Sequence, residues 1–201
     1  MARRNHISRL DAGRRSQRHA PRQPQRPVIL VVCEGQTEEA YFRAVKAHYG
    51  RSTTVNIKIT RGRSDPVRAV EKGIHVNRND DFDRVFCVVD GDKPDRTALA
   101  RKRIGKRDNV ELVVSIPCFE IWLLLHYETS DAPFAECAAV CARLKVKEHM
   151  PDYVKGIHYD FASITQHIND AIRNAQWLAG RDLANPSSDV HRVLICLRPT
   201  P

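Results

Sequence analysis

Short apolar runs alternate with helical patterns along the first half of the chain. The runs "VILVVC" (28–33), "RVFCVVD" (84–90) and "VELVVSI" (110–116) are rich in β-branched residues and contain few polar interruptions. Continuous runs of this length predict strands that are buried on both faces. The run "TTVNIKIT" (53–60) alternates apolar and polar residues, which predicts a strand with one exposed face.

Helical patterns over residues 37–50, 66–77 and 94–105 separate these strands. Strand–helix–strand alternation with continuous apolar strands is typical of a mainly parallel sheet with helices on both faces. The sequence therefore predicts an α/β core over residues 28–116.

The pattern changes after Pro117. The segment "CFEIWLLLHYE" (118–128) predicts an apolar helix, residues 133–147 predict another, and residues 160–180 predict one long amphipathic helix. We therefore expect residues 117–201 to form a C-terminal helical annex packed on the core.

The positive charge is concentrated at the N-terminus. Of the net charge of +9, residues 1–27 carry +7, from eight arginines and one aspartate, which leaves +2 for the rest of the chain. With so few apolar residues, this arm is predicted to be disordered on its own. Basic arms often neutralise phosphates, so the arm contains candidate nucleic-acid contacts: Arg3, Arg4, Arg14 and Arg15. A solubilising tail, or an arm that docks an acidic partner, is the alternative interpretation.

Composition also bounds where the protein works. No apolar segment approaches the roughly 20 residues that cross a bilayer, and no signal-peptide pattern is found. We therefore expect a soluble, cytoplasmic protein without membrane contact.

Cys137 and Cys141 have helical spacing, but no second Cys/His pair at zinc-finger spacing accompanies them. The cysteines are accordingly expected to be reduced and structural.

Acidic residues follow two of the buried strands. Glu34 ends the first, Asp90 ends a later one, and the carboxyl ends of parallel strands meet at one edge of a sheet. Glu38 lies four residues after Glu34, and Asp92 follows Asp90 with only Gly91 between them. Carboxylate oxygens are the ligands that Mg²⁺ prefers, so the pattern predicts a Mg²⁺ (or Mn²⁺) site. Acids are also common at exposed strand ends without any metal.

The pattern E-G-x-x-[DE] after one strand, together with D-x-D after a later strand, resembles the Toprim domain. This domain is shared by topoisomerases, primases and overcoming-lysogenization-defect nucleases. More narrowly, the chain resembles the RloB-like family of restriction-linked, abortive-infection proteins. The stretches that carry this resemblance run from about residue 28 to 195: "ILVVCEGQTEEAYF", "VVDGDKPD", "SIPCFEIWLLLHY", "MPDYVKG" and "NPSSDVHRVL".

The resemblance implies a Mg²⁺-dependent site for phosphodiester chemistry. Glu34 matches the family's general acid or base, Asp90 and Asp92 match its metal-binding pair, and Glu38 matches a further ligand. Two metal ions in such a site could clamp the attacking and leaving oxygens of an in-line displacement.

The remaining candidates stay open at this level. Glu120, in the F-E-x-W stretch typical of RloB-like chains, completes the catalytic cluster or is an acid favoured by a helix N-terminus. Lys93 neutralises a phosphate or is a solvated surface lysine. A few other basic side chains could line a groove, although the charged faces of surface helices explain them equally well: Lys145, Lys147, Lys155 and Arg173.

The leading hypothesis is a metal-dependent nuclease that acts on RNA, including tRNA, or on DNA in phage defence. The resemblance also implies an ATPase partner. Since the chain has no P-loop motif of its own, any ATP hydrolysis must come from elsewhere. A non-catalytic nucleic-acid-binding subunit is the main alternative, and a primase-like nucleotidyl transferase is a third. A homo-oligomer is compatible with the sequence.

Overall fold

The computed structural model describes most of the chain after the basic arm, namely residues 26–50, 55–62, 65–80, 82–146, 148–157 and 159–198. The arm with its four candidate arginines lies outside the described residues. Within the described part, no helix is both long and apolar enough to span a membrane.

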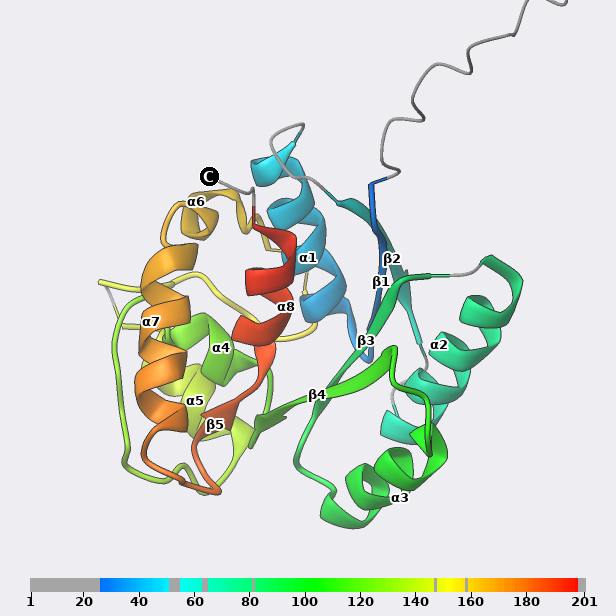
Figure 1. The fold of residues 1–201 in the computed structure, drawn as a ribbon. Coiled ribbons are helices and arrows are strands. Elements are labelled where there is room, and N and C mark those ends of the chain that lie inside the picture. Colours follow the sequence, from blue (N-terminus) through cyan, green and yellow to red (C-terminus); the bar gives the residue numbers. More distant parts are fainter. Residues whose placement is uncertain are drawn as a thin grey trace, which may run out of the picture.

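A five-stranded sheet organises the fold (Figure 1). Its strands, in spatial order, are β2 Asn56–Arg61, β1 Val28–Cys33, β3 Arg84–Asp90, β4 Val110–Ile116 and β5 Ser187–Ser188. The first four are parallel, and β5 pairs antiparallel with the end of β4. The predicted α/β fold with a mainly parallel sheet is therefore confirmed.

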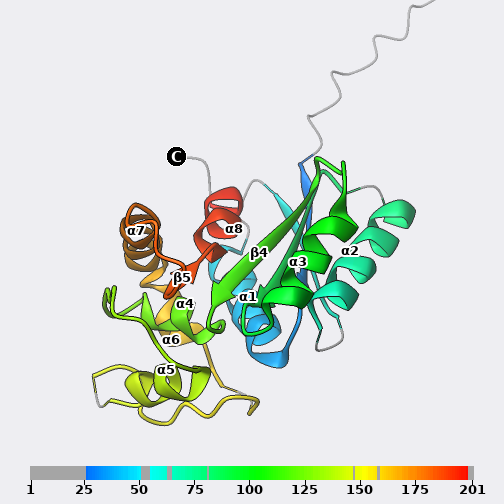
Figure 2. The same cartoon turned by 90° about the horizontal axis from the view of Figure 1, so that it is seen from below.

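Helices cover both faces of the sheet. Figures 1 and 2 show α2 Pro66–Asp80 and α3 Pro94–Ile104 on one side, and α1 Gln36–Tyr49 on the other together with the C-terminal helices. Alternate strand residues are buried against the two sides: Val31 belongs to the core beneath α1, and Val32 to the core beneath α2. The strands β1, β3 and β4 are almost continuously apolar because they have no solvent-facing side, whereas the edge strand β2 is exposed at alternate positions along its first half.

The C-terminal part contains five short helices: α4 Glu120–Leu124, α5 Cys137–Leu144, α6 Ala162–Thr165, α7 Ile168–Ala179 and α8 Val190–Leu197. The single helix predicted over 160–180 is wrong, because the chain is interrupted between α6 and α7. At this break Thr165 Oγ1 donates to the carbonyl of Ala162 (2.8 Å), and His167 N–H donates to the carbonyl of Ile164 (2.9 Å). Such side-chain and three-residue hydrogen bonds compete with continued α-helix.

The helices predicted over 118–128 and 133–147 are also shorter than expected. α4 is followed by turns in which His126 N–H and Tyr127 N–H bond to carbonyls three residues earlier (3.2 and 2.9 Å). The segment as a whole stays buried, so hydrophobicity marked the core correctly but overestimated the length of the helix.

The strand order creates a switch point between β1 and β3. From β1 the chain passes through α1 to β2 on one side, and then through α2 and α3 to β3 and β4 on the other side. Ligands of open α/β sheets bind in the crevice at the carboxyl ends of the strands beside such a point. Glu34 follows β1 there, and Asp90 ends β3.

Gly91, which follows β3, lies directly against β4. Its N–H donates to the carbonyl of Ser115 (2.8 Å), and a Cβ at this position would lie 2.4 Å from Ile116 Cγ1. We expect Gly91→Ala to lower the free energy of unfolding by about 1–3 kcal/mol, because this packed strand has no room for a methyl group. Urea unfolding measures the change.

Gly180→Ala is the matched control. A Cβ there would meet its nearest atoms at ordinary distances of 3.5 and 3.7 Å, and the residue already has helical backbone angles. Its effect should stay within about 0.5 kcal/mol. If Gly91→Ala and Gly180→Ala lower the free energy of unfolding equally, the close packing of Gly91 against Ile116 does not cause the loss.

Candidate active site

A cavity of about 320 Å³ opens at the switch point. Five carboxylates line it: Glu34, Glu38, Asp90, Asp92 and Glu120. Two lysines, Lys93 and Lys155, line it as well. The structure thus brings every predicted site residue of the described chain to one place.

Glu34 joins the ends of the two central strands. Its Oε2 accepts a hydrogen bond from the backbone N–H of Asp90 (3.2 Å), and its own N–H donates to the carbonyl of Val88 (3.0 Å). Burial, and then the charge of Asp90, raise the pKa of Glu34 to about 7. This carboxyl group can therefore take up or release a proton near neutral pH.

Glu38 is held against the beginning of α1, where Gly35 is the N-cap. A Cβ on Gly35 would lie 2.6 Å from Glu38 Oε2, so the E-G-x-x-E spacing leaves room for this carboxylate. The residue is only 4% exposed, and burial followed by the charge of Asp90 raises the pKa of Glu38 to about 8. A hydrogen bond from its own backbone N–H partly offsets this rise.

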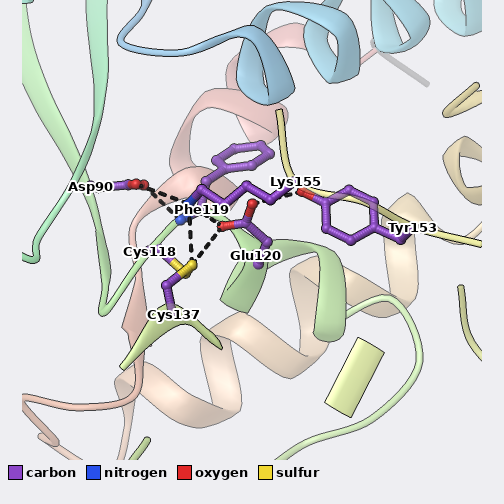
Figure 3. Close-up of a disulfide and its surroundings, with 7 residues drawn as sticks. All are labelled: Asp90, Cys118, Phe119, Glu120, Cys137, Tyr153 and Lys155. Carbon is purple, nitrogen blue, oxygen red and sulfur yellow. Dashed lines mark hydrogen bonds and ion pairs between the residues drawn. A yellow bond between two sulfur atoms is a disulfide. The ribbon is translucent and has the colours of Figure 1, made fainter. Parts of the chain in front are cut away.

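Asp90 and Glu120 share one cation, as Figure 3 shows. Lys155 Nζ lies 2.9 Å from Glu120 Oε2 and 3.4 Å from Asp90 Oδ2. Burial lowers the pKa of Lys155, but Asp90 and Glu120 raise it by more, so the net shift is upward and the ammonium form is kept. Asp90 Oδ1 also accepts from the N–H of Phe119 (2.8 Å).

Glu120 is fully buried, in contrast to Asp92, which is exposed. Its Oε1 accepts a short hydrogen bond from Tyr153 OH (2.6 Å), while Oε2 faces Lys155. These contacts give the buried charge the partners that a buried carboxylate needs. Because Glu120 also lines the cavity, the arrangement is compatible with both roles predicted for it.

Metal ligation must be considered at two places. Among the described residues, the possible ligand atoms of Cys118, Glu120 and Cys137 all lie within 4.8 Å of one another. The predicted ligands Glu38, Asp90 and Asp92 share the cavity without forming so tight a group. Their chemistry still fits Mg²⁺, since oxygen donors surround the cavity and this ion usually keeps several waters beside one or two carboxylates.

A disulfide joins two members of the Cys–Glu–Cys group. Cys118, after β4, is bonded to Cys137, the first residue of α5, with a Cα–Cα distance of 5.7 Å. The expectation that all cysteines are reduced is therefore wrong for this pair, which only the packing of α4 against α5 brings together. This group could hold a metal ion only with the disulfide reduced, since thiolates are the ligands.

Four cysteines remain free: Cys33, Cys87, Cys141 and Cys196. Cys33 and Cys87 are buried in the strands, as their apolar surroundings in the sequence indicate. The disulfide itself lies next to the cavity, because Lys155 Nζ is 3.1 Å from Cys137 Sγ.

Sequence reasoning did not place Lys155 and Tyr153 in the site. Lys155 was a candidate for a basic groove, yet it points into the carboxylate cluster (Figure 3). Both residues belong to the stretch "MPDYVKG" that carries the family resemblance, which was the one available signal. Lys145 and Arg173 do not line the cavity, and Lys147 lies outside the described residues.

Comparison with known proteins gives one match. A protein-family model described as RloB-like protein matches residues 29–197, which covers the sheet and the C-terminal helices. Neither the curated proteins nor the solved structures contain a match to this chain.

The raised pKa values of Glu34 and Glu38 make the stability of the metal-free protein depend on pH. The unfolded chain releases these protons near pH 4.3, whereas the folded chain keeps them to about 7 and 8. The folded state therefore binds more protons in this range, and the free energy of unfolding should fall as the pH rises from about 5 to 8. Urea unfolding in EDTA measures this slope.

Glu38→Gln should flatten the slope, because the amide does not titrate. Glu39→Gln is the control and should leave the slope unchanged, because this half-buried carboxylate of the same helix turn lies outside the cavity and pairs with Arg43 (2.8 Å). If the free energy of unfolding depends on pH equally in Glu38→Gln and in the wild type, the raised pKa of Glu38 does not contribute to this dependence and the explanation is wrong.

The disulfide should stabilise the fold by restricting the unfolded chain. Cys118 and Cys137 are 19 residues apart, and a loop of that length corresponds to about 3 kcal/mol in the chain-entropy account. In urea unfolding without reductant, we expect Cys137→Ser to lower the free energy of unfolding by roughly this amount. Adding reductant to the wild type should remove the difference, and Cys141→Ser is the control for loss of a free thiol.

Proposed function

Because this chain belongs to the RloB-like family, we propose that it is a divalent-metal-dependent nuclease that hydrolyses phosphodiester bonds. The observation that carries the proposal is the convergence of five carboxylates, from three separate parts of the chain, in one cavity at the switch point of the sheet. Pockets of about 300 Å³ or more are the usual size of small-molecule and cofactor sites. One phosphodiester with its immediate sugar atoms falls within that range.

The charges of the cavity fit a hard cation. Burial raises the proton affinity of both Glu38 and Asp90. The charge of Asp90 adds to the rise at Glu38, and the charge of Glu120 adds to the rise at Asp90, so a bound cation would relieve repulsion at both. Glu38, Asp90 and Asp92 would hold Mg²⁺ or Mn²⁺, which supplies positive charge for the phosphate oxygens in the transition state.

Other side chains have roles that do not depend on the metal. Glu34, with a pKa of about 7, would accept the proton of the attacking water or return one to the leaving oxygen. Lys155 orients Asp90 and Glu120 through its two ion pairs. Lys93, at the N-cap of α3, would contact a non-bridging phosphate oxygen.

The substrate and the biological setting are further parts of the proposal. We propose RNA, with tRNA included, or DNA as the substrate, an effector role in phage defence, and a separate ATPase that controls cleavage. They rest on the resemblance to restriction-linked, abortive-infection proteins and on the lack of a P-loop motif in the sequence.

One observation favours the alternative, a non-catalytic nucleic-acid-binding subunit. Lys155 already neutralises part of the carboxylate charge without any metal ion. In that case the cluster would be a structural ion-pair network, and Asp92 could be changed without consequence.

The proposal is tested by cleavage of total tRNA, single-stranded RNA and duplex DNA with Mg²⁺, Mn²⁺ or EDTA. We expect metal-dependent cleavage, and a loss of at least about 100-fold in Asp90→Asn and Asp92→Asn, because each amide removes a charged oxygen ligand. Asp108→Asn, at an exposed position between α3 and β4, is the matched control and should cleave normally.

If the isolated chain is inactive, the same assay is repeated with the proposed ATPase partner. Cleavage that appears with the ATPase and disappears in Asp92→Asn supports a partner-controlled nuclease. Binding without cleavage under both conditions, unchanged in Asp92→Asn, would establish the non-catalytic alternative.

A further inference from the structure

Figure 2 shows α2 and α3 side by side on one face of the sheet. Basic side chains are concentrated on and beside these two helices. Two surface hollows of about 330 and 450 Å³ lie there, and both include Glu71 in their lining. Around them are seven exposed cations, which we call the α2–α3 basic face: Arg61, Arg68, Lys72, Arg78, Lys102, Arg103 and Arg107. Glu71 is the one acid in the two linings, whereas the whole chain beyond residue 27 carries only +2.

Most of this charge has no acidic partner among the described residues. Arg103 pairs with Glu71 (3.1 Å), and Arg61 lies 3.7 Å from a carboxylate oxygen of Glu39. The other five cations have no ion pair within the part of the chain that the structure describes: Arg68, Lys72, Arg78, Lys102 and Arg107. Of these, Arg107 donates to the backbone carbonyl of Ile104 (2.8 Å). An attraction for an external anion therefore remains on this face.

Helix electrostatics account for only some of these positions. Arg103 is in the last turn of α3, where a cation interacts favourably with the helix dipole. Arg68 is in the first turn of α2, which contains no acidic side chain and where a cation is unfavourable. The nearby carboxylate of Asp65 is occupied by Arg96 in a bidentate pair (2.7 and 2.8 Å). Helix stability thus does not explain why Arg68 is basic.

The basic face begins at the edge of the sheet that forms the carboxylate cavity. Gly62 N–H donates to the carbonyl of Cys33 (2.7 Å), the residue before Glu34. Gln36 lines the cavity, and with its amide oxygen and nitrogen exchanged it accepts a hydrogen bond from Arg61 Nη1 (2.9 Å). From this edge the face follows α2, in which ten residues advance about 15 Å.

We propose that the α2–α3 basic face binds the phosphate backbone of the nucleic acid whose scissile bond enters the carboxylate cavity. This inference rests on the proposed function, since it extends the substrate site. A cavity with five carboxylates repels a polyanion, so the affinity must come from positive charge beside it. About 15 Å corresponds to roughly four nucleotides of a duplex strand, at 3.4 Å each.

The test removes three of the unpaired charges in the full-length chain, with Arg68→Gln, Lys72→Gln and Arg78→Gln combined. Binding of labelled single-stranded RNA and duplex DNA is followed by fluorescence anisotropy in EDTA, between about 50 and 300 mM KCl. We expect affinity to fall on the order of 100-fold at about 100 mM salt, and the slope of log K against log salt to fall by about 2 to 3. Circular dichroism melting confirms that the variant is folded.

The matched control removes the same number of exposed charges from outside α2 and α3: Lys46→Gln, Arg181→Gln and Arg198→Gln combined. It should bind within about twofold of the wild type, with nearly the same salt slope. An equal loss in both triple variants would show that only net charge matters and would overturn the inference. Unchanged binding in the α2–α3 variant would overturn it as well. If the α2–α3 variant binds nucleic acid normally but no longer binds the ATPase partner, the face binds an acidic protein surface instead, and the inference is overturned.

A second substrate separates this inference from the proposed function. Bis(p-nitrophenyl) phosphate is too short to reach from the cavity to α2, so its hydrolysis reports on the carboxylate site alone. If the wild type binds nucleic acid through the basic face but cleaves neither substrate, with or without the ATPase partner, the nuclease proposal fails and the assignment of the phosphate-binding face stands. If both substrates are cleaved and the triple variant binds normally, only this inference fails.

Discussion

The accumulation of like charge in a partly buried place is the constraint on which the candidate site depends. Five carboxylates surround one cavity, and burial withholds the water that would otherwise screen them. The fold offsets this in two ways: Lys155 pairs with Asp90 and Glu120, and the pKa values of Glu34 and Glu38 rise to about 7 and 8. Carboxyl groups with such raised pKa values can exchange protons near neutral pH, and a cation that binds beside them reduces their repulsion. Acid–base chemistry depends on the first property and metal binding on the second.

This balance requires both halves of the chain. The sheet supplies Glu34 and Asp90 at the ends of neighbouring strands, and the C-terminal part supplies Glu120 with the segment that carries Tyr153 and Lys155. The disulfide reinforces this junction, since Cys118 precedes Phe119, whose N–H holds Asp90, and Cys137 contacts Lys155. The C-terminal helices therefore complete the cavity as well as cover the sheet.

The charge distribution around the cavity is consistent with the proposed chemistry. Five carboxylates line the cavity at the switch point, while cations without ion pairs among the described residues begin near the same edge and follow α2. A polyanion would be attracted by the basic face and would bring one phosphate to the carboxylates. Arg61 and Gln36 lie where the two regions meet.

The sequence by itself determined the sheet and the identity of most acids in the site. Apolar runs define strands because burial on both faces excludes polar residues, and strand ends carry the acids because the parallel strands stop at one edge. The resemblance to the RloB-like family, carried by these motifs, is confirmed over residues 29–197. The interruption between α6 and α7 was not predictable, since it follows from local hydrogen bonds that compete with a periodic apolar pattern.

Only the tertiary structure decided how the site is neutralised and held. Lys155 follows Asp90 by 65 residues and Glu120 by 35, and Cys137 follows Cys118 by 19. No local rule of spacing connects such residues, because their contact depends on how the C-terminal helices pack against the end of the sheet. The basic face has the same origin: Arg68 and Lys102 belong to separate helices, and they form one surface because both helices pack on the same side of the strands. Local periodicity therefore encoded the elements, and long-range packing determined which charges meet.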